Sequence, residues 1–231
     1  MKKMILSAAL VLASTAAMAQ SGTFQLKANL KNMGDTIIVY KGRGEKRDTI
    51  LVKKDKFTYS VTLTQPKEMM FAQPAIFRGG RAEAFYLVCV PGETAEVVGD
   101  LKAKFDIKGS NFYKQFAEVD AMKDEADKEL ADFEKSINEK MKNGGDREAL
   151  MKEYEEKAPA LTKVKEEKML AFIGQHPDYE ASATLIGEMS SCENMQKAVD
   201  MLSAQVKNGR MKAFYEPIVE RAKKQAEMEE K

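Results

Sequence analysis

The chain has few of the residue types from which catalytic and metal centres are built. It contains one histidine, two cysteines and no tryptophan among 231 residues. A metal site needs several converging His, Cys, Asp or Glu ligands, and a Ser-His-Asp arrangement would have to use His176, which precedes Pro177 in a predicted loop. No Cys-x-x-Cys, Walker or Gly-x-Ser-x-Gly motif is present. We therefore expect no metal, no cofactor and no catalytic residue, and we favour a non-enzymatic role over an enzyme.

Neither sign of charge is in excess. The chain has 37 Lys and Arg residues against 36 Asp and Glu residues, a formal net charge of +1. Removing residues 1–19 would take away Lys2 and Lys3, which leaves 35 basic against 36 acidic residues. Such a balance offers no electrostatic basis for binding nucleic acid or an anionic membrane surface. We expect no nucleic-acid partner.

The chain also lacks an apolar run long enough to span a bilayer. Its longest run, from Ile5 to about Ala17, is shorter than the roughly 18 to 20 residues that a spanning helix needs. Two lysines precede this run, and Ala17-Met18-Ala19 places small residues where a signal peptidase requires them. We predict a signal peptide at residues 1–19, a periplasmic or secreted mature protein, and no transmembrane segment after cleavage. The cleavage point has no cysteine, which argues against an acylated lipoprotein.

Residues 20–110 are predicted to form a β-rich domain of about eight strands. Segments rich in β-branched and aromatic residues alternate there with Gly, Asp, Lys or Pro turns. In one predicted hairpin, Phe57, Tyr59 and Val61 share a face through the two-residue period of a strand. The run Ala75-Ile76-Phe77 continues the strand pattern. Short, closely connected strands are typical of an antiparallel β-sandwich or partial barrel.

Residues 111–231 are predicted to be helical, so the expected fold class is α+β. Apolar residues recur at three- and four-residue spacing over about 30 residues after Ser110, until Asn143-Gly144-Gly145-Asp146 breaks the pattern. Asp146 can cap a second helix, and the short break predicts a helical hairpin in which Pro159 kinks the second helix or shifts its start. Shorter helices are predicted over 180–188, 194–206 and from 212 onward. Charged runs such as Lys123-Asp124-Glu125 are interpreted as solvated helix surface.

The two cysteines lie in different predicted settings. Cys89 belongs to an apolar run typical of a buried strand, and we interpret it as a small core residue. Cys192 follows Ser190-Ser191 at a predicted helix start, where the helix N-terminus lowers a thiol pKa, so it is the better candidate for a reactive thiol. The two lie about a hundred residues apart, and the sequence leaves open whether they form a disulfide.

Arg78-Gly79-Gly80-Arg81 is a candidate ligand-binding turn in the β-rich domain. Paired guanidinium groups that flank a flexible turn can hold a carboxylate or phosphate through bidentate hydrogen bonds. The simpler interpretation is a solvated hairpin tip.

Several short segments, taken in their order along the chain, resemble a known family. They are FQLKA at 24–28, GDTIIVY at 34–40, DT at 48–49, KFTY at 56–59, PGE at 91–93 and IKGS at 107–110. Together they resemble the β-rich domain of unknown function that precedes the thioredoxin-like domain in envelope thiol:disulfide interchange proteins of the TlpA and ResA type. FIGQHPDYEAS at 172–182 is similar to the helical connector that follows it. Where those proteins continue into a redox domain with a Cys-x-x-Cys pair, we expect none here, so the resemblance assigns no catalytic residue.

These observations lead to one leading hypothesis and two alternatives. The leading hypothesis is a non-catalytic periplasmic binding or protein-interaction module associated with envelope thiol-redox proteins. Its partner would be a protein of the envelope, such as the thioredoxin-like proteins that the resemblance implies. One alternative is a thiol-dependent redox accessory protein that uses Cys192, with Cys89 as a second thiol. The other is a binder of small ligands that uses Arg78 and Arg81.

Overall fold

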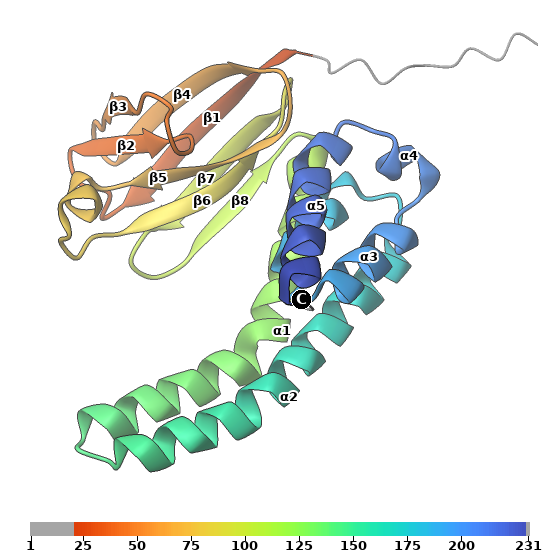
Figure 1. Ribbon diagram of the computed structural model, residues 1–231. Helices are drawn as coiled ribbons and strands as arrows, with labels where there is room; N and C mark the ends of the chain where they lie inside the picture. Colours follow the sequence, from red (N-terminus) through yellow and green to blue (C-terminus); the bar gives the residue numbers. More distant parts are fainter. Residues whose placement is uncertain (1–20, 230–231) are drawn as a thin grey trace, which may run out of the picture.

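Eight strands form two four-stranded sheets that pack as a sandwich in the computed structural model (Figure 1). The first sheet has the order β4 (Lys56–Leu63), β1 (Gly22–Lys31), β7 (Thr94–Asp100) and β8 (Phe105–Gly109). The second has the order β3 (Asp48–Leu51), β2 (Thr36–Tyr40), β5 (Lys67–Ala72) and β6 (Ala84–Cys89). The structure describes residues 21–229, so the predicted signal peptide lies outside the described residues.

Alternating side chains build the core of the sandwich. Every second residue of β1 from Phe24 to Leu30 is buried and the residues between them are exposed, as the two-residue period of a strand requires. Phe71 lies among other aromatic rings. Its ring stacks on that of Phe85 with the centroids 4.9 Å apart, and the ring of Tyr59 meets it edge-on at 5.7 Å. The predicted sandwich is confirmed.

One strand pairing differs from the expected antiparallel pattern. β1 and β7 pair in parallel, from Gln25 opposite Thr94 to Lys31 opposite Asp100, whereas the other described pairs are antiparallel. A parallel pair joins segments that are distant along the chain, so no local turn sequence predicts it.

The run 75–77, predicted as part of a strand, is instead in a 3₁₀ helix, η1 (Pro74–Arg78). Pro74 fixes a backbone angle suited to the first helical turn. Gly79 ends the helix with a left-handed φ of 74°, a conformation that glycine adopts without strain.

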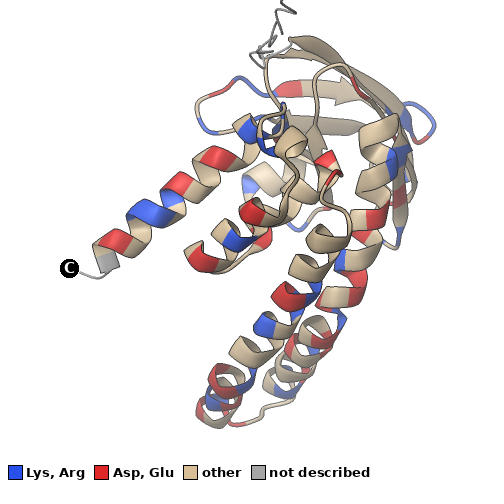
Figure 2. Ribbon diagram, turned by 90° about the vertical axis from the view of Figure 1, so that its right-hand side faces the viewer, with Lys and Arg blue, Asp and Glu red and all other residues tan. Residues whose placement is uncertain are grey.

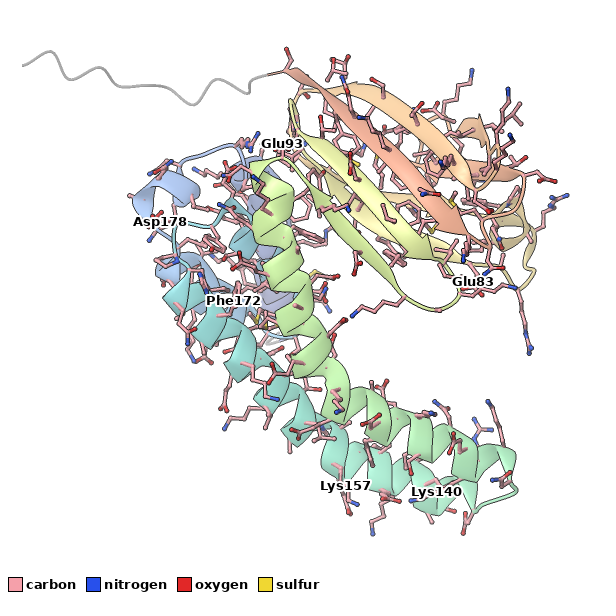
Figure 3. The ribbon with its side chains drawn as sticks, turned by 180° about the vertical axis from the view of Figure 1, so that it is seen from behind. Glu83, Glu93, Lys140, Lys157, Phe172 and Asp178 are labelled. Carbon is pink, nitrogen blue, oxygen red and sulfur yellow. The ribbon has the colours of Figure 1, made fainter. Side chains whose placement is uncertain are left out.

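Two long helices, α1 (Asn111–Lys142) and α2 (Arg147–Gln175), form the predicted hairpin. The side chain of Asp146 accepts hydrogen bonds from the backbone N–H groups of Glu148 and Ala149, as its predicted capping role requires. Pro159 lies inside α2 and removes one helical hydrogen bond. The hairpin changes direction midway, near the labelled Lys157, which fits the predicted kink (Figure 3).

The remaining described chain packs against the base of the hairpin. It comprises the 3₁₀ helix η2 (Glu180–Glu188) and the helices α3 (Cys192–Met201), α4 (Ala204–Lys207) and α5 (Lys212–Glu229). The helix predicted over 194–206 is therefore two helices, separated at Leu202 and capped again by the side chain of Ser203. None of the described helices is both long enough and apolar enough to cross a membrane.

The sandwich and the base of the helical part share one hydrophobic core. Phe112 and Tyr113 at the start of α1 are fully buried in it, together with Phe24 of β1 and Met211 before α5. The far half of the hairpin lies outside this core and runs below the sandwich in the view of Figure 1.

Phe71→Ala is expected to lower the free energy of unfolding by about 3–5 kcal/mol, because it removes a fully buried ring and leaves a cavity. Chemical denaturation measures the change. Leu51→Ala provides the control, since this side chain is 69% exposed and its loss should cost less than about 0.5 kcal/mol. A loss below 1 kcal/mol in Phe71→Ala, on the order of a surface change, would contradict this core.

Candidate binding groove

An arginine between α4 and α5 joins the sandwich to the helical part. The Nε atom of Arg210 donates to both carboxylate oxygens of Glu180 at 3.1 and 3.2 Å, and its Nη1 atom donates to the carbonyl oxygen of Pro91 at 3.1 Å. Its Nη2 atom donates to Glu93, which lies in the turn between β6 and β7. We call Arg210, Glu93, Glu180 and Ser110 the Arg210 clasp. It connects the sandwich, the first residue of η2 and the loop before α5.

The carboxylate of Glu93 also holds the start of α1. It accepts hydrogen bonds from the hydroxyl of Ser110 and from the backbone N–H of Phe112. Burial raises the pKa of Glu93, but the hydrogen bonds from Ser110 and Arg210 and the charge of Arg210 outweigh burial and bring it below its ordinary value. Glu93 therefore stays ionised and takes the capping position that the side chain of Ser110, the N-cap residue, leaves unused.

Gly109 makes the close approach of β7 to the end of β8 possible, just before α1 begins. Its φ is 152°, and a Cβ atom at this position would overlap the carbonyl oxygen of Thr94. The sandwich continues into the helices at this residue, and the shared core around Phe112 and Tyr113 packs the two parts together. The Arg210 clasp adds a charged attachment between them.

Beside the clasp lies a groove between the sandwich and the helices. It has a volume of about 690 Å³ and is lined by β5, β6, β8, the turn before β8, α1, η2 and α5. Aromatic side chains form much of its surface, and they are Tyr86, Phe105, Phe116 and Phe214. Tyr86 is 59% exposed, which is unusual for an aromatic residue on a sheet. The volume lies within the range of typical ligand sites.

The charged side chains of the groove are predominantly acidic. Four carboxylates line it against two ammonium groups, and these residues are Glu68, Asp120, Asp124, Glu188, Lys104 and Lys123. Lys123 pairs with Glu188, and Lys104 lies 3.9 Å from Asp124 in an exposed pair. The carboxylates of Glu68 and Asp120 form no ion pair with a described residue. Elsewhere the two signs of charge are intermingled along the helices (Figure 2).

Both unpaired carboxylates have a raised pKa. For Asp120 the main cause is burial, followed by the negative charge of Asp124, and the lysines nearby compensate only in part. Glu68 is exposed as a residue, but its carboxyl lies in the groove, whose walls remove part of its hydration and raise its pKa, and the charge of Glu188 adds to this effect. The groove thus holds negative charge that the protein itself does not neutralise.

The candidate arginines of the sequence lie elsewhere. Arg78 ends η1 and Arg81 lies in the loop before β6; both are exposed, and neither lines the groove. Their guanidinium groups form no hydrogen bond or ion pair with a described residue. The structure thus brings no further ligand-binding group to them.

Both cysteines are free thiols in different parts of the fold. Cys89 is buried in β6, and burial raises the pKa of its thiol far above the ordinary value, as expected for a core residue. Cys192 is the first residue of α3, behind the N-cap Ser191, as predicted. The buried carboxylate of Glu166 accepts from the backbone N–H of Ser190 and the side-chain amide of Asn194, which fixes this helix start.

His176 has a packing environment. Its ring lies 4.5 Å from the ring centroid of Phe172 and 4.5 Å from that of Tyr179. No group of three or more His, Cys, Asp or Glu side chains suited to a metal ion occurs in the described part of the chain.

Sequence patterns did not reveal the groove or the clasp. Lys123 and Asp124, interpreted as solvated helix surface, line the groove; Asp124 is nevertheless exposed, as is the neighbouring Glu125, whereas Lys123 is half-buried. Arg210 meets Glu93 across 117 positions of the chain, so no local spacing links them. The charged residues of α1 could be assigned to the groove only after the structure showed β5 and β6 opposite them.

Comparisons of the chain with protein-family models, with curated proteins and with solved structures find no match. The function must therefore be argued from the geometry.

Arg210→Ala tests the clasp. The variant leaves the carboxylates of Glu93 and Glu180 without their cation, so we expect the free energy of unfolding to fall by about 1.5–3 kcal/mol. Chemical denaturation measures this change. Arg78→Ala is the matched control, because its guanidinium pairs with none of the described residues, and it should change stability by less than about 0.5 kcal/mol. Equal effects of the two variants would show that the clasp does not stabilise the fold.

Asp120→Asn is expected to leave stability unchanged or to raise it. The pKa of Asp120 is higher in the folded than in the unfolded protein, so its ionised form destabilises the fold above that pKa and the penalty disappears as pH falls through it. The variant should be more stable than the wild type by up to about 1 kcal/mol at neutral pH and lose this advantage toward about pH 3. Thermal denaturation across this range measures it. A variant clearly less stable at neutral pH would mean that the carboxylate has a structural role.

Proposed function

We propose that the protein is a non-catalytic interaction module that binds a partner protein in the groove between the sandwich and the helices. The observation that carries this proposal is the pair of unneutralised carboxylates, Glu68 and Asp120, beside the exposed ring of Tyr86. Charge kept without a partner in a partly dehydrated cleft destabilises the empty protein. Residues of this kind concentrate at functional sites.

The chemistry of the lining favours recognition. The groove contains neither histidine nor cysteine, so it offers no thiolate nucleophile and no imidazole base. It offers aromatic surface, which is enriched in protein interfaces, and negative charge, which selects a partner of opposite charge.

The setting of this interaction is also a proposal. The predicted signal peptide places the partner in the periplasm or outside the cell, and the resemblance to envelope thiol:disulfide interchange proteins makes a thioredoxin-like protein the first partner to test. Neither cysteine lines the groove, so the proposed contact needs no thiol of this chain.

Site-specific photocrosslinking in cells tests the proposal. A benzophenone amino acid in place of Tyr86, in the protein expressed at its native level, should give a discrete crosslinked product. The same amino acid in place of Leu51 is the control, because this residue is 69% exposed on β3, at the opposite edge of the same sheet. Glu68→Lys and Asp120→Lys should weaken the product at position 86. Equal products at positions 51 and 86, or none at 86, would refute the groove as the binding site.

A further inference from the structure

The groove contains an unpaired sheet edge. β6 is the last strand of its sheet and pairs on one side only, with β5. In an antiparallel pair, the backbone N–H and C=O of one residue point to the same side, and successive residues point to opposite sides. The residues of β6 therefore divide into one set that bonds to β5 and one set that faces away from it.

Two hydrogen bonds show which set is which. The backbone N–H of Gln73, at the end of β5, donates to the carbonyl of Glu83, so Glu83 and every second residue after it face β5. At the other end, the carbonyl of Val88 accepts the hydroxyl of Tyr113 from α1, so Val88 faces outward. Both bonds give the same assignment: odd-numbered residues of β6 face β5, and even-numbered residues face away from it. Ala84 and Tyr86 consequently direct their N–H and C=O groups outward, and no described group pairs with them.

The open part of this edge, Ala84 to Tyr86, enters the groove at Tyr86. Tyr113 covers only the end of β6 at Val88, whereas Tyr86 lines the groove and is 59% exposed. Opposite the strand runs α1, from which Asp120 also lines the groove. Figure 3 shows α1 descending beside the edge of the sandwich.

The surroundings of the edge select the side chains of an added strand. Glu68 pairs with Val88 and therefore shares the outer face of the sheet with Tyr86. Phe85 points to the inner face, where its ring lies 5.8 Å from that of Phe105 on the last strand of the other sheet. A strand added to β6 would thus meet carboxylates on one face and aromatic rings on the other.

We propose that the groove binds an extended, basic segment of the partner protein as an additional strand on β6, with Lys or Arg side chains alternating with apolar ones. The inference rests on the proposed function and specifies the segment that the groove recognises. Main-chain hydrogen bonds to Ala84 and Tyr86 provide affinity, and the carboxylates of Glu68 and Asp120 receive the cationic side chains. A free amine would neutralise the carboxylates but leave the backbone edge unpaired.

Synthetic peptides test this inference on the whole mature protein by titration calorimetry. The probe is an acetylated, amidated hexapeptide of alternating lysine and valine, and the control has glutamate in place of lysine. We expect the lysine peptide to bind at least about tenfold more tightly than the glutamate peptide. Lowering the pH should weaken its binding, because the carboxylates must be ionised.

Backbone methylation separates strand addition from simple charge attraction. Two further probes carry N-methyl groups either on all lysines or on all valines, which places the methyl groups on opposite edges of the extended peptide. Strand addition predicts that one of them loses about tenfold or more in affinity while the other stays within about threefold of the parent. Equal affinities of both for the protein, or no binding of the parent at about 1 mM, would overturn the inference.

Protein variants complete the test. Asp120→Asn should weaken binding of the lysine peptide roughly threefold to fivefold, whereas Asp132→Asn, an exposed carboxylate farther along α1, should not change it. Ala84→Pro removes an outward N–H without touching the β5 ladder and should weaken binding at unchanged stability. The photocrosslink at position 86 decides the proposed function independently: a product there together with failed peptide tests would leave the groove as a binding site and reject strand addition.

Discussion

The ion pair between Glu93 and Arg210 links the two halves of the structure close to the point where the chain passes from one to the other. That point is Gly109, and just beyond it Phe112 and Tyr113 pack into the core that both halves share. Glu93 joins the β6–β7 turn to the first turn of α1, and Arg210 joins the same carboxylate to η2 and to the loop before α5. Because each charge is partly removed from water, losing one partner would leave the other unpaired, so the network favours one geometry.

The groove follows from that geometry. Its walls belong to separate parts of the chain, and it exists only while α1 stays at a fixed angle to β6. The structure keeps a cluster of carboxylates there at a cost to stability, together with an unpaired strand edge, which proteins usually protect. A basic extended chain of the kind proposed would pair with both the carboxylates and the strand edge. That one ligand would satisfy both features is the physical argument for a binding role.

Local patterns sufficed for much of the fold. Alternation in β1 predicted its buried face, and Asp146 was correctly placed as the cap of α2. The strand predicted at 75–77 was wrong. Pro74 and Gly79 mark the two ends of a 3₁₀ helix, and their effect outweighed the β propensity of Ile76 and Phe77. The parallel pairing of β1 with β7 had no local signal.

The candidate site could not be predicted from local sequence patterns for a related reason. A charged residue on a helix such as Asp120 looks the same in sequence whether it faces water or a cleft, because the opposite wall comes from elsewhere in the chain. The same holds for Arg210, whose partners lie 30 and 117 positions away. The composition shows that histidine and cysteine are scarce, but it contains no information on which distant segments enclose a groove.

The most direct test is the distance in solution between the sandwich and α1, the two parts that enclose the groove. Spin labels at Arg81, in the loop before β6, and at Lys128 on α1, in a Cys192→Ser background, report this distance by double electron–electron resonance. We expect one narrow distribution that becomes broad when Arg210→Ala is added, because the clasp holds α1 at its angle to the sandwich. Identical narrow distributions with and without Arg210 would contradict the claim that this clasp holds the groove in shape.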